Sequence, residues 1–531
     1  MSQHHPRTLL ELLERAVSAN PSRDLLVFPD HRLSYSAFHQ RVLLARRALI
    51  GMGVHRGDNV GVLMQNCPDH LALMFAISSL GAVDVPINTR NRPSELAHVV
   101  EDAGLRLIFT STLGSDVSDL PARLAEAIAL LGGRIEPRIV LLDGAPTAGL
   151  QASAEVLAAA SGVTEEQAEA LAAETTGDDA AVMLYTSGTT ANPKGCPLLH
   201  RQLLSISGQV GERWGTREGD KVWNALPYFH ASSILPLLAC IRVNGTFISA
   251  TVFEPEETIR MIREEGATLA WPAFGTVWQE ILTHPTFTAE SVQTVRAIIA
   301  VAPPETVHTM ERSAPNVAIL SCYGITEGLG VPVMVRYDDD PVIRTETSGL
   351  PFDGIEVEVR DPETRERLPW GERGALWLRG ENVFGGYWND PQHTAEAFDD
   401  EGWFNTGDLA SQEESGVVSY HGRLKDMLKV GGENVAAVEI EAYLSTHPAV
   451  KLAAVVGAPD RKYGEVPAAF IELRPGATAT AEELIEYCRA GIAGFKVPRY
   501  LRFVTEWPMS ATKIRKVDLQ RELAEELSVG A

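Results

Sequence analysis

Short apolar runs alternate with segments of helical periodicity along the first part of the chain. The runs at residues 59–64 and 107–109 are short and apolar, as buried strands are, and residues 83–86 are interpreted as a further strand. Residues 69–80 have apolar positions at helical spacing. Because a helix between successive strands lets those strands run in the same direction, this alternation predicts an α/β fold with layered, mostly parallel sheets.

Two changes of pattern divide the chain, whose 531 residues are too many for one compact core. Short β segments separated by turn residues predict a small β subdomain over residues 349–379. A new α/β pattern begins after Lys425, so we expect a large N-terminal domain over residues 1–424 and a small, mobile α+β domain over residues 425–531. The Ala- and Glu-rich residues 144–176 are interpreted as a surface helix with flanking loops.

Composition narrows the classes of partner. The formal net charge of −24 would repel a phosphate backbone, so no nucleic-acid partner is expected. Five scattered cysteines without a CxxC pair argue against a disulfide framework and against a zinc site. No apolar run has the length of a membrane span or of a signal peptide, so we expect a cytoplasmic protein without a membrane span. The sequence leaves a homodimer open.

The most informative segment is the loop that follows the apolar residues 180–184. It reads YTSGTTANPKG from Tyr185 to Gly195. Small hydroxyl residues and glycine let backbone N–H groups approach an anion, so the loop is expected to bind a polyphosphate. The P-loop of common NTPases has Ser or Thr after its lysine, whereas Gly195 and Cys196 follow here. The candidate phosphate ligands are Thr186, Ser187, Gly188, Thr189, Thr190 and Lys194.

Together with six later segments in the same order, this loop resembles the signature of the adenylate-forming superfamily. That superfamily includes acyl-CoA synthetases, luciferases and the adenylation domains of peptide synthetases. The resemblance covers nearly the whole chain and is closest to carboxylate–CoA ligases. The later segments are PYFH from Pro227, YGITE from Tyr323, GWFNTGD from Gly402, GRLKD from Gly422, GGEN from Gly431 and KIRK from Lys513.

The resemblance implies an AMP-forming acid–thiol ligase that uses ATP, Mg²⁺ and coenzyme A. A carboxylic acid would attack ATP to give an acyl-adenylate and pyrophosphate, and the CoA thiol would then give acyl-CoA and AMP. Because the acid and ATP are both anions, such a site must neutralise phosphate charge and align the attack. The acid is already ionised at neutral pH, so its attack needs no general base.

The resemblance also implies catalytic roles. Glu327 is the expected contact to Mg²⁺, and Thr326 would bond an oxygen of the α-phosphate. Lys513 is the expected catalytic lysine, which would bridge the acid and the α-phosphate. The family usually has glycine before this lysine, whereas this chain has Thr512, which adopts a positive φ less easily. Lys516 is the alternative for the same role.

The resemblance also implies which residues contact the nucleotide. Three residues are expected around adenine: Tyr323, Ala302 and Pro303. Val301 replaces the glycine that usually precedes the last two. Asp408 would accept hydrogen bonds from both ribose hydroxyls, with Arg423 assisting.

The second half-reaction is expected to use another orientation of the C-terminal domain. Lys425 is the family's hinge position, where one dihedral change would alternate the domain between the two half-reactions. Gly431, Gly432 and Glu433 would then line the CoA tunnel, because the glycines leave backbone room for a pantetheine arm.

The expected acyl pocket is apolar and rich in small residues. Its candidate residues are His230, Ala231, Ser232, Trp271, Gly324, Ile325 and Gly330. No Asp or Glu is placed to bind an amino group, so an amino acid is not expected as substrate. We expect a hydrophobic acid of the bulky aryl, medium-chain or polycyclic kind. His230 is interpreted as a gate or wall residue and not as a general base.

Three alternatives stay open on the sequence. A ligase that loads its acyl group onto a carrier protein would share these motifs. A luciferase-like oxygenase would use the same adenylate. A non-catalytic ligand-binding homologue is motivated by Thr512, although the intact phosphate loop, Glu327 and Asp408 count against it.

Overall fold

The computed structural model describes residues 5–114, 119–142, 149–186, 193–224, 226–302, 304–430, 433–460, 463–510 and 513–529. The chain forms two compact units. Unit 1 comprises residues 1–301, 310–356 and 378–404, and unit 2 comprises residues 302–309, 357–377 and 405–531. Unit 2 therefore includes residues that lie before the expected boundary, and the hinge at Lys425 stays a prediction.

The first sheet of unit 1 has six strands in the order β6-β5-β3-β4-β7-β8. All neighbours run parallel except β7 and β8, which are antiparallel. Helices α4 and α5 cover one face, and α3, which is buried along its whole length, packs against β4 and β7. The elements are β3 (Asn59–Leu63), α3 (Pro68–Ser78), β4 (Val83–Pro86), α4 (Pro93–Asp102), β5 (Leu107–Ser111), α5 (Leu120–Leu130), β6 (Arg138–Leu142), β7 (Ala180–Thr186) and β8 (Lys194–Leu199).

The second sheet of unit 1 has seven strands in the order β13-β12-β11-β9-β10-β1-β2. Its neighbours are also parallel, except for the N-terminal hairpin β1–β2. The N-terminal hairpin is therefore in one sheet with strands β9 to β13, all of which follow the first sheet in the chain. The elements are β1 (Asp24–Val27), β2 (Arg32–Ser34), β9 (Lys221–Trp223), β10 (Thr246–Ile248), α11 (Pro255–Glu265), β11 (Leu269–Phe274), α12 (Gly275–Thr283), η1 (Ala289–Val292), β12 (Ala297–Val301) and β13 (Ala318–Leu320). Helix α13 (Pro304–Ser313) lies between β12 and β13 in the chain, and its residues up to Thr309 belong to unit 2.

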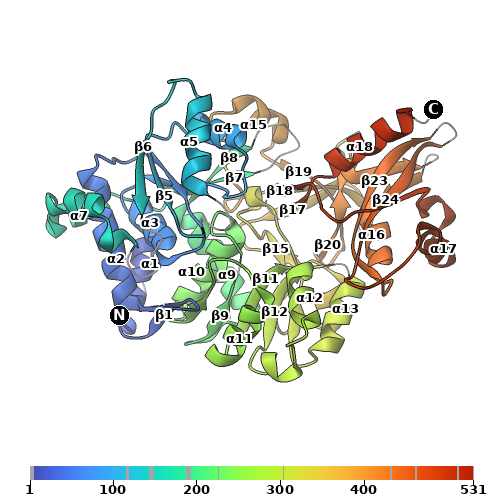
Figure 1. Ribbon diagram of the computed structural model, residues 1–531, viewed down its shortest axis with the longest axis horizontal. Coiled ribbons are helices and arrows are strands. Elements are labelled where there is room, and N and C mark those ends of the chain that lie inside the picture. The colour runs from blue at the N-terminus through green and yellow to red at the C-terminus, as the bar shows by residue number, and fades with distance from the viewer. Residues whose placement is uncertain are drawn as a thin grey trace. The chain divides into compact units, whose positions relative to one another are not determined.

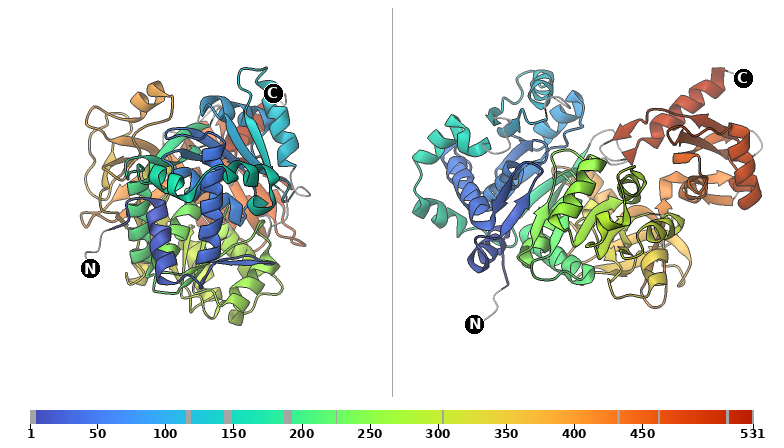
Figure 2. Two further views of the ribbon diagram at one scale, coloured as in Figure 1. Left: turned by 90° about the vertical axis from the view of Figure 1, so that its left-hand side faces the viewer. Right: turned by 60° about the horizontal axis from the view of Figure 1, so that its bottom comes forward.

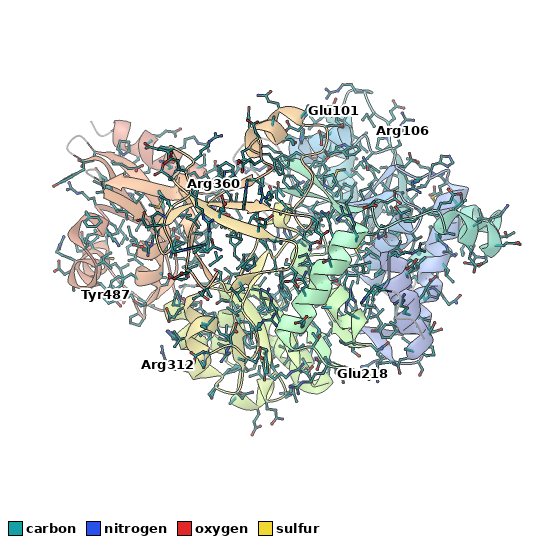
Figure 3. All side chains as sticks on the ribbon, turned by 180° about the vertical axis from the view of Figure 1, so that it is seen from behind. Glu101, Arg106, Glu218, Arg312, Arg360 and Tyr487 are labelled. Carbon is teal, nitrogen blue, oxygen red and sulfur yellow. The ribbon has the colours of Figure 1, made fainter. Side chains whose placement is uncertain are left out.

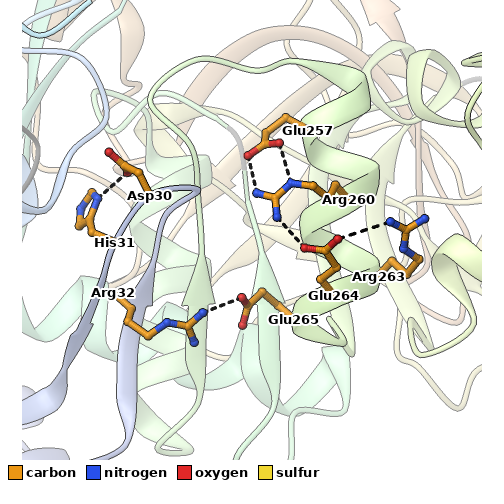
Figure 4. A network of polar contacts seen from close by, with 8 residues as sticks. All are labelled: Asp30, His31, Arg32, Glu257, Arg260, Arg263, Glu264 and Glu265. Carbon is orange, nitrogen blue, oxygen red and sulfur yellow. Dashed lines mark hydrogen bonds and ion pairs between the residues drawn. The ribbon is translucent and has the colours of Figure 1, made fainter.

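Charged side chains tie the N-terminal hairpin to α11 (Figure 4). Arg32 lies 2.9 Å from Glu265 at the end of α11, as Figure 4 shows. It also lies 3.1 Å from Asp24 on the paired strand. Within α11, Arg260 contacts both Glu257 and Glu264. These groups are largely exposed, so each pair contributes only about 0–1 kcal/mol to stability.

Side-chain caps decide where several helices of unit 1 begin. Thr8 caps α1 (Leu9–Ala19) and Ser34 caps α2 (Tyr35–Gly51), and these two helices lie side by side (Figure 2, left). One surface helix was expected over residues 144–176, but three short helices lie there, and α7 packs on α2 (Figure 1). Ser153 and Thr164 explain the difference, because each caps a new helix. The three are α6 (Gly149–Ala152), α7 (Ala154–Ser161) and α8 (Glu165–Ala172).

A three-stranded antiparallel sheet, β14-β15-β16, completes unit 1 beside helix α9. Arg213 of α9 donates hydrogen bonds to the carbonyls of Met334, Leu350 and Pro351 and so holds β15 and β16 to the helix. The elements are α9 (His200–Trp214), α10 (Ala231–Arg242), β14 (Cys322–Tyr323), η2 (Thr326–Gly328), β15 (Val333–Met334), α14 (Pro341–Glu346), β16 (Leu350–Pro351) and α15 (Pro391–Ala397).

Unit 2 contains most of a four-stranded sheet, β17-β18-β19-β20, and a five-stranded sheet of β21 to β25. The helices α16 and α17 contact each other through Tyr443 and Tyr487, whose rings stack with centroids 5.0 Å apart (Tyr487 is labelled in Figure 3). The elements are β17 (Glu356–Arg360), β18 (Arg373–Arg379), β19 (Phe404–Gln412), β20 (Val418–Arg423), η3 (Leu424–Asp426), β21 (Met427–Val430), β22 (Glu433–Ala436), α16 (Ala437–Ser445), β23 (Val450–Asp460), β24 (Gly464–Leu473), α17 (Ala481–Gly491), η4 (Gly494–Lys496), β25 (Tyr500–Phe503), β26 (Met509–Ser510), β27 (Lys513–Ile514) and α18 (Lys516–Val529).

The expected fold class is confirmed: mostly parallel sheets layered with helices form the large N-terminal part, and a smaller β/α part follows. Within the described ranges, no helix is both long enough and apolar enough to cross a membrane.

Candidate active site

The expected phosphate loop connects the antiparallel strands β7 and β8. Thr186 ends β7 and Lys194 begins β8, and the two residues are opposite each other in the strand register. The other four candidate ligands, Ser187, Gly188, Thr189 and Thr190, lie outside the described residues. The strand pair therefore holds a hydroxyl and an ammonium group at the two ends of the loop.

Glu327 lies in the short turn η2, which follows β14. Its side chain is only 8% exposed. The turn ends at Leu329 and Gly330, which both have positive φ, +59° and +95°, and the N–H groups of Gly328 and Gly330 donate to the carbonyl of Ile325. A buried carboxylate is thus presented by a tight, hydrogen-bonded turn.

A phenol connects this carboxylate to the phosphate-loop lysine. The hydroxyl of Tyr387 lies 2.9 Å from Oε1 of Glu327, and Nζ of Lys194 lies 4.9 Å from the centroid of the Tyr387 ring. Oε2 of Glu327 accepts no hydrogen bond from a described residue. The structure therefore brings together two of the expected site residues and adds one that the sequence analysis did not name.

Tyr387 belongs to the 384–389 loop, which is anchored at both ends. The N–H of Phe384 donates to the carbonyl of Glu327 (2.9 Å), and that of Trp388 donates to the carbonyl of Gly195 (2.8 Å). Position 195 requires glycine, because an added Cβ would lie 2.9 Å from Cβ of Trp388. The sequence signal for this loop was its glycine pair followed by two aromatic residues, but its contacts lie far away in the chain.

The arrangement fits a magnesium ion bound mainly through nucleotide phosphates. Among the described residues, no three His, Cys, Asp or Glu side chains form a group that could hold a metal by themselves. Mg²⁺ typically takes one or two carboxylates together with phosphate oxygens and waters. Glu327, with one oxygen bonded by Tyr387 and the other available, could supply that single carboxylate.

Small residues of the expected acyl pocket lie against one another. A Cβ added to Gly330 would be 2.7 Å from Cβ of Ala231, and one added to Gly324 would be 2.9 Å from the carbonyl oxygen of Gly330. Ser232 and Ile325 are partly exposed next to them in the chain. The backbone of the loop after η2 therefore packs directly on the start of α10.

Trp271 and His230 of the expected pocket each pack against another aromatic side chain. Trp271 is 1% exposed, and its ring packs edge-on against Trp214 of α9 at 5.3 Å between centroids. The register of β11 shifts between Ala270 and Ala273, which has φ +54°, so this strand is irregular where Trp271 lies. The partly exposed His230 precedes α10, with its ring 4.7 Å from that of Phe229. A substrate contact for Trp271 stays a prediction.

In unit 2, the expected ribose ligand is held by a charged neighbour. Asp408 on β19 is 2% exposed and is paired in register with Arg423 on β20, whose Nε lies 3.1 Å from Oδ1 of Asp408. The backbone N–H of Asp408 donates to Thr406 Oγ1, which in turn donates to the carbonyl of Leu376. Ala302 also belongs to unit 2, and Pro303 lies outside the described residues.

The two candidate lysines are in different situations. The backbone of Lys513 pairs in the short hairpin β26–β27, while its side chain and Thr512 lie outside the described part. Nζ of Lys516 lies 2.7 Å from Glu441 and 3.7 Å from Asp426, two carboxylates of the same unit. These ion pairs occupy Lys516, and the catalytic role of Lys513 stays a prediction.

The candidate residues for the second half-reaction are partly described. Lys425 is exposed in the turn η3 between β20 and β21. Gly431, Gly432 and the side chain of Glu433 lie outside the described residues, so the CoA tunnel stays a prediction.

Comparison with known families decides the class of the protein. The model of the AMP-binding enzyme family matches residues 13–388, and that of the AMP-binding enzyme C-terminal domain matches residues 439–513. The chain belongs to the AMP-binding enzyme family. Like the acyl-CoA synthetases and ligases among its relatives, this AMP-binding enzyme is an AMP-forming acid–thiol ligase that uses ATP and CoA, and Mg²⁺ is the usual ion of the family.

Other AMP-binding enzymes match over their full length. A Rhodococcus jostii (strain RHA1) ligase that joins CoA to the propanoyl side chain of a 7a-methyl-1,5-dioxo-octahydroindene is 32% identical, covering 97% of this chain and 99% of that protein. The anthranilate CoA ligase AuaEII in complex with anthranoyl-AMP has a TM-score of 0.85 at 25% identity, with 99% of both chains covered. ATP-bound MatB from Rhodopseudomonas palustris has a TM-score of 0.83 at 27% identity, with 97% and 99% covered.

Proposed function

We propose that this chain is an ATP-dependent carboxylate–CoA ligase for a hydrophobic carboxylic acid of the bulky aryl, medium-chain or polycyclic kind. The observation that carries the adenylation step is the grouping of Lys194, Tyr387 and Glu327, which places a cation and a carboxylate on one aromatic side chain. Polyphosphate and its metal ion require those two kinds of group side by side.

Each residue has a proposed part in forming the acyl-adenylate. Lys194 and the hydroxyl of Thr186 bind the polyphosphate, and Thr326 bonds an α-phosphate oxygen. Glu327 holds Mg²⁺, which when bound neutralises phosphate charge. Lys513 offsets the charge that the acid and the α-phosphate share in the transition state.

The nucleotide and the thiol have their own proposed contacts. Asp408 accepts hydrogen bonds from the ribose hydroxyls, and Arg423 orients its carboxylate. For thiolation, the C-terminal domain turns at Lys425, and the Gly431–Gly432 backbone faces the pantetheine arm. No protein base is required for the acid, because a carboxylate is ionised at neutral pH.

The proposed acid class rests on the pocket residues. Gly324, Gly330 and Ala231 carry little or no side chain, and none of the pocket residues carries a charge that would bind an amino group. The acids of two similar proteins support the class: one is built on two fused rings and the other, anthranilate, is aromatic.

The test is a screen of acids for pyrophosphate release and thioester formation. Medium-chain, cinnamic-type and bicyclic propanoic acids are each offered with ATP, Mg²⁺ and either CoA or a phosphopantetheinyl carrier protein, and Glu327→Gln and Asp408→Asn serve as inactive controls. We expect acyl-CoA from at least one of these acids. Transfer to the carrier protein alone would identify the carrier-loading alternative, and light emission would identify the oxygenase. The absence of pyrophosphate release with every acid would support the non-catalytic homologue.

A further inference from the structure

Tyr387 contacts two charged side chains from separate elements of unit 1. Its hydroxyl is 2.9 Å from Oε1 of Glu327 in η2, and the face of its ring is 4.9 Å from Nζ of Lys194 at the start of β8. One side chain therefore contacts both a cationic and an anionic residue of the expected site.

The hydroxyl acts on the carboxylate. The phenol O–H donates the hydrogen bond, and the carboxylate oxygen Oε1 accepts it. A partner of this kind fixes the orientation of a metal-binding carboxylate and leaves its other oxygen for the ion. In this chain the other oxygen, Oε2, accepts nothing from a described residue.

The ring acts on the lysine. The face of an aromatic ring attracts an ammonium group within about 6 Å, and the distance to Lys194 is inside that range. A lysine side chain has four rotatable carbon–carbon bonds, so a resting position beside the phosphate loop reduces the freedom that it loses when phosphate binds.

The protein holds Tyr387 itself in place. Its N–H donates to Oγ1 of Thr394 (2.9 Å), and its ring packs edge-on against Phe384 with centroids 4.9 Å apart. The residues on either side are bound to the backbone of Glu327 and of Gly195. Two elements of the site are thus connected through one anchored loop.

We propose that Tyr387 is a positioning residue for Mg·ATP: its hydroxyl holds the Glu327 carboxylate for Mg²⁺, and its ring holds Lys194 for the polyphosphate. The inference deepens the proposed function and depends on it for the identity of the ligand. The two parts of the side chain have separable effects, because phenylalanine keeps the ring and removes only the hydroxyl.

The experiment measures ATP binding by isothermal titration calorimetry at a series of Mg²⁺ concentrations, without any acid. For Tyr387→Phe we expect the half-saturating Mg²⁺ concentration to rise by about 10- to 100-fold, with nearly normal ATP affinity once Mg²⁺ is saturating. For Tyr387→Leu, which also removes the ring, we expect ATP affinity to stay reduced at saturating Mg²⁺.

A matched control is available in the same loop. Trp388→Phe removes the hydrogen bond from Nε1 to the carbonyl of Asp102 (3.1 Å) and touches neither contact of Tyr387, so its Mg²⁺ dependence should equal that of the wild type. An equal shift in Trp388→Phe and Tyr387→Phe would attribute the effect to loosening of the loop and overturn the inference. If Tyr387→Phe had the same Mg²⁺ dependence as the wild type, the inference would be overturned and the proposed function would still stand. If the wild-type protein bound no ATP at any Mg²⁺ concentration, both would be overturned.

Discussion

The hydroxyl of Tyr387 donates a 2.9 Å hydrogen bond to Glu327, which lies 60 positions earlier in the chain. The same ring lies beneath the ammonium group of Lys194. The candidate metal ligand and the candidate phosphate ligand therefore contact the same side chain. Groups that are arranged in advance need little reorganisation when charge develops in the reaction.

The assignment of the catalytic lysine can be tested by two alanine variants. Lys513→Ala should lower adenylate formation by about 100- to 1,000-fold, because it removes a preorganised cation from the α-phosphate. It should spare the reaction of CoA with a supplied acyl-adenylate. Lys516→Ala breaks the ion pairs with Glu441 and Asp426 and should affect both half-reactions alike. A selective loss of adenylation in Lys516→Ala would move the catalytic role to that residue.

The hinge can be tested by Lys425→Pro. Leu424, Lys425 and Asp426 form a helical turn in this structure, and a proline disfavours helical geometry at the residue before it. We expect one half-reaction to be impaired far more than the other, because only one orientation of the C-terminal domain should remain accessible. Pyrophosphate exchange reports adenylation, and CoA capture of preformed acyl-adenylate reports thiolation. An equal loss in both assays would indicate misfolding, and normal rates in both would exclude Lys425 as the pivot.

A substitution at Gly330 should reduce the usable size of the acid. In Gly330→Ala, the new Cβ would lie 2.7 Å from Ala231, and φ of +95° is unfavourable for alanine. We expect kcat/KM for a bulky acid to fall by about 10- to 200-fold relative to that for a short acid, since one extra carbon in an apolar pocket has an effect of this size. Gly162→Ala, where an added Cβ has nothing within 4 Å, is the control and should leave this ratio unchanged. An equal decrease in kcat/KM for all acids would show that Gly330 does not select among acids.

Asp84 should make the protein less stable as pH rises. It is 1% exposed on β4, neither carboxylate oxygen has a hydrogen-bond partner among the described residues, and burial raises its pKa well above the ordinary value. Between the unfolded pKa near 4 and the raised folded pKa, the folded state binds more protons, so the free energy of unfolding falls by up to about 1.4 kcal/mol per pH unit. Asp84→Asn removes this titration and should flatten the decrease of Tm with pH, whereas Asp400→Asn, at an exposed position, should not.

His200 should make the protein less stable as pH falls in the acidic range. Its Nδ1 accepts a hydrogen bond from the N–H of Leu9, its Nε2 faces the carbonyl of Ser78, and burial lowers its pKa to about 4. Because the unfolded histidine binds a proton below about pH 6.5, the free energy of unfolding falls by up to about 3 kcal/mol as pH decreases from 6.5 to 4. His200→Gln should be less stable at pH 8 but lose less between pH 6.5 and 4. If the slope of Tm against pH were the same in His200→Gln and in the wild type, other groups would be responsible for the acid sensitivity.

Local periodicity was sufficient to predict several elements of the first sheet of unit 1, whereas strands β9 to β13 of the second sheet were not predicted. The apolar run 59–64 corresponds to β3, and the helical spacing over residues 69–80 corresponds to α3, because both patterns reflect burial along a single element. The division of residues 149–172 into three helices was missed, although the caps Ser153 and Thr164 were visible in the sequence. An Ala- and Glu-rich composition favours helix throughout and hides such interruptions.

The site could be predicted only where a motif carries it. The apolar run before the phosphate loop corresponds to β7, and the roles assigned to the motif residues stay predictions. Tyr387 was missed because its partners are distant in the chain. The packing of Trp271 against Trp214 was also missed, since it depends on an irregularity in β11 that apolar periodicity does not reveal. Contacts of this kind are set by tertiary packing and not by local sequence.

The N-terminal hairpin has a consequence for how the chain folds during translation. Thr246 Oγ1 donates to the carbonyl of Asp24, 222 positions earlier, where β10 lies beside β1. At about 5–20 residues per second, a ribosome needs roughly 10 to 45 s to supply that partner. Throughout this interval, the edge of β1 that pairs with β10 has no partner. The residues of the first sheet emerge during the same interval and can assemble. The nascent chain should therefore depend on chaperones, or on a temporary partner for β1, until β10 has left the exit tunnel.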